Sequence, residues 1–204
     1  GGRGVVPELD SRGIQRGIDH HTHQIASQWR TDLPGTMLAT NGWSSMGFGI
    51  PATYAAKLAH PDRAVVGVIG DGCFQMTNQE LVTCSLNNIP IKVAIINNES
   101  LGMVRQWQSL FYQGRYSNTD LHSKRIPDFA KLAEAMGCVG LRCESKSDID
   151  KIIKEANAIN DAPVVVDFNV YRDAMVWPMV AAGTSNDDIM IAREMAPDWD
   201  SQEL

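Results

Sequence analysis

Apolar runs alternate with amphipathic stretches along most of the chain. The run at 64–69 (AVVGVI) has no polar alternation, which favours a strand buried on both faces. Further strands are predicted at 91–96, 138–143 and 164–170, and a short apolar run lies at 37–40. Helices are predicted at 46–59, at 75–87 and at 127–136, and a fourth is expected to be capped by Ser147. Its buried stripe would comprise Ile149, Ile152, Ile153, Ala156 and Ile159.

This alternation of strands and helices predicts the fold class and the domain limits. Right-handed crossovers between parallel strands give a doubly wound, mostly parallel α/β sheet with helices on both faces. The domain would span 17–170, and 1–16, rich in Gly and Arg, reads as a linker. We expect 171–204 to be a tail lying over the domain, with a short acidic helix from about Asp187.

Composition narrows the class of protein. The 204 residues are 44% hydrophobic and carry a net charge of −6, which suits a folded domain and argues against disorder or nucleic-acid binding. No apolar run reaches the ~18–20 residues that a membrane span needs. The chain begins at Gly1 without a signal segment, so we expect a processed chain or a piece of a longer polypeptide.

Cysteines and histidines offer two further candidate features. Four cysteines are present without a C-x-x-C pair, and a chain with an ample core needs no disulfides, so reduced thiols in a cytoplasmic compartment are expected. His20, His21 and His23 form an H-H-T-H cluster that would suit zinc, although no Glu or Cys stands nearby at a familiar ligand spacing. Zinc binding at these histidines remains one alternative.

The strongest chemical signal follows two neighbouring buried strands. Gly70-Asp71-Gly72 ends one strand and Asn97-Asn98 ends the next. Such strand ends are where open α/β sheets bind ligands. The glycines permit close approach of a phosphate, while Asp71 and Asn98 offer the hard oxygens that Mg²⁺ prefers. Either sequence alone is equally typical of an ordinary turn. Together they predict a diphosphate–magnesium cradle.

At this point the residues resemble a known family. Gly70-Asp71-Gly72, 24 residues and then Asn97-Asn98 look like the thiamine diphosphate signature. The stretches GDGCFQMTNQEL, INNESLGMVRQWQSLFYQGRYSNTDL, IPDFAKLAEAMGCVGLRCES and DAMVWPMVAAGTSNDDI resemble the C-terminal domain of the acetolactate synthase (acetohydroxyacid synthase) catalytic subunit. The resemblance runs from about Gly35 to Asp188 and is most specific from Gly67 onward.

The resemblance implies roles for individual residues. Asp71 and Asn98 would bind Mg²⁺ through their side chains, and Ser100 through its main-chain carbonyl. Met46 would wedge thiamine diphosphate into a bent form, so that its amine takes a proton from the reactive ring carbon. Trp107 would favour 2-ketobutyrate as second substrate. The implied cofactor contacts are His23, Gln24, Met46, Gly70, Asp71, Gly72, Cys73, Asn98, Ser100, Leu101, Gly102 and Met103, and the implied substrate channel is Met103, Val104, Trp107 and Phe111.

Spacing alone gives a different interpretation of part of this set. Met103, Val104, Trp107, Leu110 and Phe111 follow one face of a helix, and such a stripe is more often core. Only the resemblance favours a channel.

Two stretches depart from the family pattern. His21-Thr22-His23-Gln24 stands where the family usually has Gly-Gln-His-Gln. The loop at 40–47 reads TNGWSSMG where the family usually has SGGLGTMG, so that Trp43 is a large change in a glycine-rich loop. These departures keep open another thiamine diphosphate-dependent 2-ketoacid decarboxylase or oxidase. A non-catalytic nucleotide- or metal-binding module is the third alternative.

The resemblance also implies an activity and partners. Pyruvate would be decarboxylated and joined to a second pyruvate or to 2-ketobutyrate, early in branched-chain amino-acid biosynthesis. The family's activating glutamate lies in the N-terminal thiamine-binding domain of a neighbouring subunit, and its FAD binds mostly outside the region that resembles this chain. A homodimer or homotetramer, and a regulatory small subunit, are implied. We expect the chain alone to be inactive.

Overall fold

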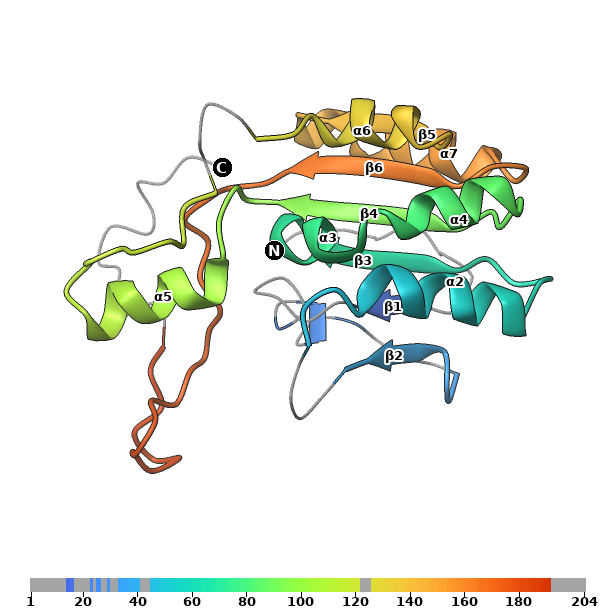
Figure 1. Cartoon of the computed structure of the whole chain (residues 1–204). Helices are drawn as coiled ribbons and strands as arrows, with labels where there is room; N and C mark the ends of the chain where they lie inside the picture. Colours follow the sequence, from blue (N-terminus) through green and yellow to red (C-terminus); the bar gives the residue numbers. More distant parts are fainter. Residues whose placement is uncertain are drawn as a thin grey trace.

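The sheet is parallel throughout and forms the centre of the domain (Figure 1). The computed structural model describes residues 14–16, 23, 25–26, 29, 33–40, 45–121 and 126–191. Within these residues, six strands pair in the order β2-β1-β3-β4-β6-β5, and every pairing is parallel. The strands are β1 (Ile14–Arg16), β2 (Met37–Ala39), β3 (Val66–Gly70), β4 (Lys92–Asn97), β5 (Val139–Cys143) and β6 (Val164–Asn169).

Helices lie on both faces of this sheet, which confirms the predicted doubly wound α/β class. The helices on the faces are α2 (Gly49–Ala59), α3 (Asp71–Thr77), α4 (Glu80–Leu86), α6 (Phe129–Ala135) and α7 (Ile149–Ala158), whereas α5 (Gly102–Phe111) lies beyond one edge (Figure 1). The larger core joins α2, α3, α4 and α6 to one face of the sheet. Within it the rings of Phe74 and Phe129 pack edge to face, with their centroids 5.3 Å apart. A smaller core packs Ala156 of α7 against Val164 and Val166 on the opposite face.

Three predicted helices differ in their limits. The helix expected at 75–87 is two helices, because the amides after α3 donate to carbonyls three residues back, as Leu81 does to Asn78 at 3.0 Å. The helix expected at 46–59 starts only at Gly49, because Gly47 has a φ of +87° that no right-handed helix includes. The predicted cap at Ser147 is wrong, since Ser145 caps a 3-10 turn, η1 (Lys146–Asp148), before α7 begins.

The two ends of the described chain also bring corrections. Strand β1 comes from the last three residues of the segment expected to be a linker, and it lies between β2 and β3. The acidic helix expected from Asp187 is absent up to residue 191. Instead a turn forms in which the Ser185 amide donates to the Asp188 carboxylate at 3.1 Å. Ile149, expected in the buried stripe of α7, is 37% exposed.

The structure bears on the cysteines and on the question of a membrane span. All four cysteines are unpaired, as predicted, and all four are buried. Among the residues described, no helix combines the length and apolar character needed to cross a membrane.

The strand order places a crevice at one edge of the sheet. From β1 the sheet extends to β2 on one side, and from β3 it extends to β4 on the other. The strand order therefore reverses between β1 and β3, and such sheets bind ligands beyond the carboxyl ends of the strands at this point. Helix α5 lies beyond this edge, facing the arrowheads of β3 and β4 (Figure 1).

Candidate cofactor site

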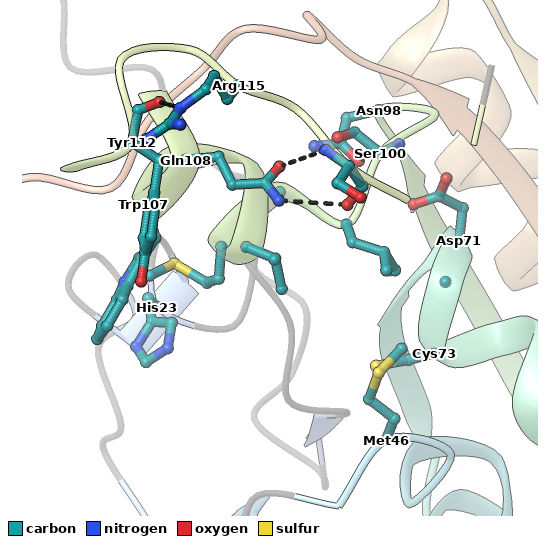
Figure 2. A pocket seen from close by; sticks show the side chains of 17 residues that line it. His23, Met46, Asp71, Cys73, Asn98, Ser100, Trp107, Gln108, Tyr112 and Arg115 are labelled. Atoms are coloured by element: carbon teal, nitrogen blue, oxygen red, sulfur yellow. Dashed lines mark hydrogen bonds between the residues drawn. The ribbon is translucent and has the colours of Figure 1, made fainter. Parts of the chain in front are cut away.

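A cavity of about 890 Å³ opens at the carboxyl ends of β3 and β4. Its predicted lining residues are His23, Met46, Gly70, Asp71, Gly72, Cys73, Asn98, Ser100, Leu101, Gly102, Met103, Val104 and Trp107. In Figure 2, Asp71, Asn98 and Ser100 lie toward one side of the cavity, and Trp107 with Tyr112 lies toward the other. The topology thus brings together almost every residue that the sequence singled out.

The turn after β3 supplies one wall. Gly70 is extended, with φ −71° and ψ 156°, and Asp71 begins α3 with only 2% of its surface exposed. A Cβ on Gly72 would stand 2.7 Å from Cδ2 of Leu101 and 3.5 Å from Cε of Met46. The side chain of Met46 therefore reaches over the Gly72 backbone.

The turn after β4 supplies the facing wall. Asn98 is 1% exposed, and its Oδ1 accepts a hydrogen bond from the Ser100 amide at 3.3 Å. Its Nδ2 has no hydrogen-bond partner among the described residues. Ser100 is held in turn because its hydroxyl donates to the Thr119 carbonyl at 3.1 Å. A buried carboxamide with one end lacking a protein partner is costly unless a ligand binds there.

These features fit a magnesium-bound diphosphate. Asp71 offers carboxylate oxygens, and a 180° turn of the Asn98 carboxamide would present its oxygen to a cation in exchange for the bond from the Ser100 amide. The bare Gly72 backbone leaves room that any side chain would occupy. The donor set is all oxygen, which suits Mg²⁺ better than a soft metal.

Helix α5 forms the apolar wall, and the core interpretation of its stripe is wrong. Val104 is 51% exposed and Trp107 42% exposed, and both line the cavity together with Met103. Phe111 is not among the lining residues, but its ring meets that of Trp107 edge to face at 5.8 Å. The buried residue of α5 is the polar Gln106.

Four lining residues were not predicted. They are Gln108, Tyr112, Arg115 and Ser117. Gln108 donates to the Ser117 carbonyl at 3.2 Å and accepts from the Ser117 amide at 3.3 Å, and Nε of Arg115 donates to the Tyr112 carbonyl at 3.2 Å (Figure 2). These residues belong to one of the stretches that carry the resemblance, but they match no phosphate or metal motif.

Part of the predicted site lies outside the described residues. Gln24, Trp43, His20 and His21 fall there, so zinc at the histidine cluster stays a hypothesis. Among the residues that are described, no group of three or more His, Cys, Asp or Glu side chains forms a metal site.

A buried acid stands behind the Asn98 loop. Asp167 of β6 is 3% exposed and accepts a hydrogen bond from Nδ2 of Asn97 at 3.0 Å. Burial raises the pKa of the Asp167 carboxyl, while the Asn97 hydrogen bond and the nearby Arg142 guanidinium act in the opposite direction.

The fold and the cavity define a domain of the parallel α/β class that binds a cofactor at the carboxyl edge of its sheet. Residues 18–168 match the family described as "Thiamine pyrophosphate enzyme, C-terminal TPP binding domain". The chain therefore belongs to the thiamine pyrophosphate enzymes and carries their C-terminal TPP-binding domain.

Individual proteins extend this relationship. The acetolactate synthase of Mycobacterium bovis is 59% identical over 186 residues, which cover 90% of this chain and 30% of that protein. The acetolactate synthase large subunit of Corynebacterium glutamicum is 48% identical, over 92% of this chain and 30% of that protein. Among solved structures, a thiamine diphosphate-dependent 4-hydroxybenzoylformate decarboxylase of Rhodococcus jostii RHA1 has a TM-score of 0.72 and 27% identity, over 81% of this chain and 31% of that one. The chain thus spans about a third of the length of its curated relatives.

Proposed function

We propose that this chain binds thiamine diphosphate with Mg²⁺ as the cofactor-binding part of an acetolactate synthase. The substrates would be pyruvate and either a second pyruvate or 2-ketobutyrate, in branched-chain amino-acid biosynthesis. The observation that carries the proposal is that buried Asp71 and buried Asn98 line the same cavity, and that the amide nitrogen of Asn98 has no hydrogen-bond partner in the described part of the chain. Identity of 59% to an acetolactate synthase, against 27% to a decarboxylase, favours this activity over the alternatives.

Each wall of the cavity has a role in this proposal. Asp71, Asn98 and the Ser100 carbonyl hold Mg²⁺, and Gly70, Gly72 and Cys73 lie against the diphosphate. Bound thiamine diphosphate supplies the electron sink for decarboxylating a 2-ketoacid. Met46 keeps the cofactor bent, as expected from its position over Gly72. The remaining predicted contacts are His23, Gln24, Leu101, Gly102 and Met103.

The apolar wall selects the second substrate. Met103, Val104 and Trp107 expose apolar surface at the cavity, where one extra methylene of an acceptor changes the binding free energy by about 1–3 kcal/mol. Phe111 fixes the Trp107 ring through their edge-to-face contact. Trp107 is thus the residue we assign to the preference for 2-ketobutyrate.

The rest of the enzyme completes the site in this proposal. An activating glutamate would come from the N-terminal thiamine-binding domain of a neighbouring subunit in a homodimer or homotetramer. FAD and a regulatory small subunit would bind mostly elsewhere, and the enzyme would work in the cytoplasm. The chain alone would bind the cofactor without making acetolactate.

The test of cofactor binding uses the chain itself. Isothermal titration calorimetry should show thiamine diphosphate binding that requires Mg²⁺. The variant Asp71→Ala should lose it, because a metal ligand is removed from a buried site. Asp161→Ala removes an exposed acid distant from the cavity in sequence and should bind like the wild type. Equal binding by Asp71→Ala would show that the cradle is wrongly assigned.

The test of acceptor choice uses the assembled enzyme. With pyruvate and 2-ketobutyrate in competition, Trp107→Leu should shift the products toward 2-acetolactate by about 10-fold or more, since the contact that distinguishes the methylene is lost. Phe111→Leu should shift them in the same direction but less. An unchanged product ratio in Trp107→Leu would place acceptor selection elsewhere.

A further inference from the structure

A line of polar groups, of which Asp167 and Asn97 are buried, joins the sheet to the loop that carries Asn98. Asp167 of β6 pairs in register with Arg142 of β5, and its Oδ2 lies 3.5 Å from Nε of that guanidinium. Its Oδ1 accepts from Nδ2 of Asn97, the last residue of β4, at 3.0 Å. Burying a carboxylate is costly, so both of its oxygens need such donors.

Asn97 uses both ends of its carboxamide. While Nδ2 donates to Asp167, Oδ1 accepts from the Glu99 amide at 3.1 Å. This second bond closes an Asx turn over residues 97–99. Glu99 has a φ of +55°, a left-handed conformation that costs a non-glycine residue about 1–2 kcal/mol. The turn persists only because neighbouring groups hold it.

The Asp167 carboxylate is the nearer of two acceptors that set the orientation of the Asn97 amide, since Nδ2 also donates to Oδ1 of Asn169 at 3.5 Å. An ionised Asp167 only accepts hydrogen bonds, so it attracts Nδ2 and leaves Oδ1 toward the Glu99 amide. With the amide reversed, two donors would face each other at Glu99 and the turn would lose its support. The loop beyond the turn contains Asn98 and Ser100, which line the cavity.

We propose that Asp167 is a positioning residue for the metal: through Asn97 it fixes the turn that presents Asn98 and Ser100 to Mg²⁺. The inference rests on the proposed function, because it assigns a device to the same magnesium site. Asp167 itself does not line the cavity, so it acts only through Asn97.

Exchanging the two side chains separates this role from a general effect on folding. In Asp167→Asn, the Arg142 cation attracts the single oxygen, which turns the new NH₂ against that of Asn97. In Asn97→Asp, two carboxylates face each other at the place where Nδ2 of Asn97 and Oδ1 of Asp167 are 3.0 Å apart in the wild type. In the double variant, the new carboxylate at position 97 accepts from the new carboxamide at position 167 and from the Glu99 amide. That carboxamide still offers its oxygen to Arg142, so the bonds from Arg142 to Glu99 are restored, with donor and acceptor exchanged only between positions 97 and 167.

The measurement is the Mg²⁺ dissociation constant in the presence of thiamine diphosphate, obtained by calorimetry on the 204-residue chain below each variant's unfolding temperature. Each single variant should bind Mg²⁺ about 10-fold more weakly, and the double variant should return to within about 3-fold of wild type. A merely structural role would lower the unfolding temperature without changing Mg²⁺ affinity in the folded protein.

Asp128→Asn is the matched control. Asp128 is the other carboxylate on Arg142, at 2.5 Å, and it caps α6 by accepting from the Lys131 amide. Asparagine also caps helices well, so this variant should change stability slightly and leave Mg²⁺ affinity unchanged.

The outcomes distinguish the two proposals. A wild-type chain that binds no thiamine diphosphate with Mg²⁺ would overturn the proposed function, and this inference with it. Binding by wild type with unchanged affinity in Asp167→Asn would overturn only the role of Asp167. That isosteric variant decides the matter even if Asn97→Asp does not fold. Weak Mg²⁺ binding in both single variants without recovery in the double variant would also contradict the positioning role of Asp167.

Discussion

Gln106 holds the segment at 171–191 against α5, and replacing it should release that segment. Gln106 is 2% exposed within α5. Its Oε1 accepts from the Val176 amide at 2.7 Å, and its Nε2 donates to the Val176 carbonyl at 2.9 Å. Figure 1 shows the segment running past α5 at the carboxyl edge of the sheet. Gln106→Leu keeps the volume of the side chain and removes both bonds.

The free energy lost in Gln106→Leu follows from the two hydrogen bonds that the variant removes. Each hydrogen bond contributes about 0.5–1.5 kcal/mol net, so the pair contributes about 1–3 kcal/mol. Val176 is only half-buried, so water reaches its main chain once the segment lifts. The variant should therefore open locally at this segment and not unfold globally. The locally open state should be about 5–150-fold more populated than in the wild type. The start of the segment stays tied, because Arg105 pairs with Asp173 at 2.5 Å.

Hydrogen–deuterium exchange with mass spectrometry is the suitable assay. Peptides from 174–180 should exchange faster in Gln106→Leu, while peptides from β4 and β6 should not change. Gln108→Leu is the control, since Gln108 makes the same kind of paired contact with Ser117 and not with Val176. Unchanged exchange at 174–180, or an equal rise throughout the chain, would refute the argument that Gln106 acts as a local clamp.

Two further predictions concern the core of the domain. A Cβ on Gly140 would lie 2.1 Å from a main-chain oxygen of α6, so Gly140→Ala should lower the free energy of unfolding by about 3 kcal/mol. A calorimetric scan should show a melting temperature about 6–12 °C lower. A change below about 2 °C would mean that α6 can move away. Burial raises the pKa of Cys84 to about 12 and that of Cys138 to about 11. Neither thiolate forms below about pH 9, so neither thiol should react with Ellman's reagent at pH 8 until denaturant is added; rapid labelling of either in the native chain would contradict their burial.

The sheet was predictable wherever the chain crosses the core. The central residues of β3 and β4 are apolar or glycine because both faces of these strands are covered, and that pattern is visible in the sequence. Strand β1 was not predictable, because Ile14–Arg16 is three residues long and two of them are polar. Its place in the sheet depends on pairing with β2 and β3, which no local pattern records.

The site shows a similar division. Asp71 and Asn98 were predictable because each directly follows a buried strand, and parallel strands end at a common edge. The α5 stripe was misleading on spacing alone, since a cavity wall and a core face have the same period. Gln106 gave no signal, because its burial depends on main-chain groups of a segment 70 residues away.

The two walls of the cavity are fixed by different kinds of interaction. The wall formed by the turn after β4 is tied to the sheet, because Asn97 at the start of that turn is hydrogen-bonded to Asp167 in the neighbouring strand. Helix α5 exposes its apolar face to the cavity and is bound to the adjoining segments through Gln106 and Gln108. Polar clamps of this kind open at a lower cost than a packed core. In the proposed function, changes in the sheet should therefore alter how tightly the cofactor is held, whereas changes in α5 and its clamps should alter which substrate is accepted.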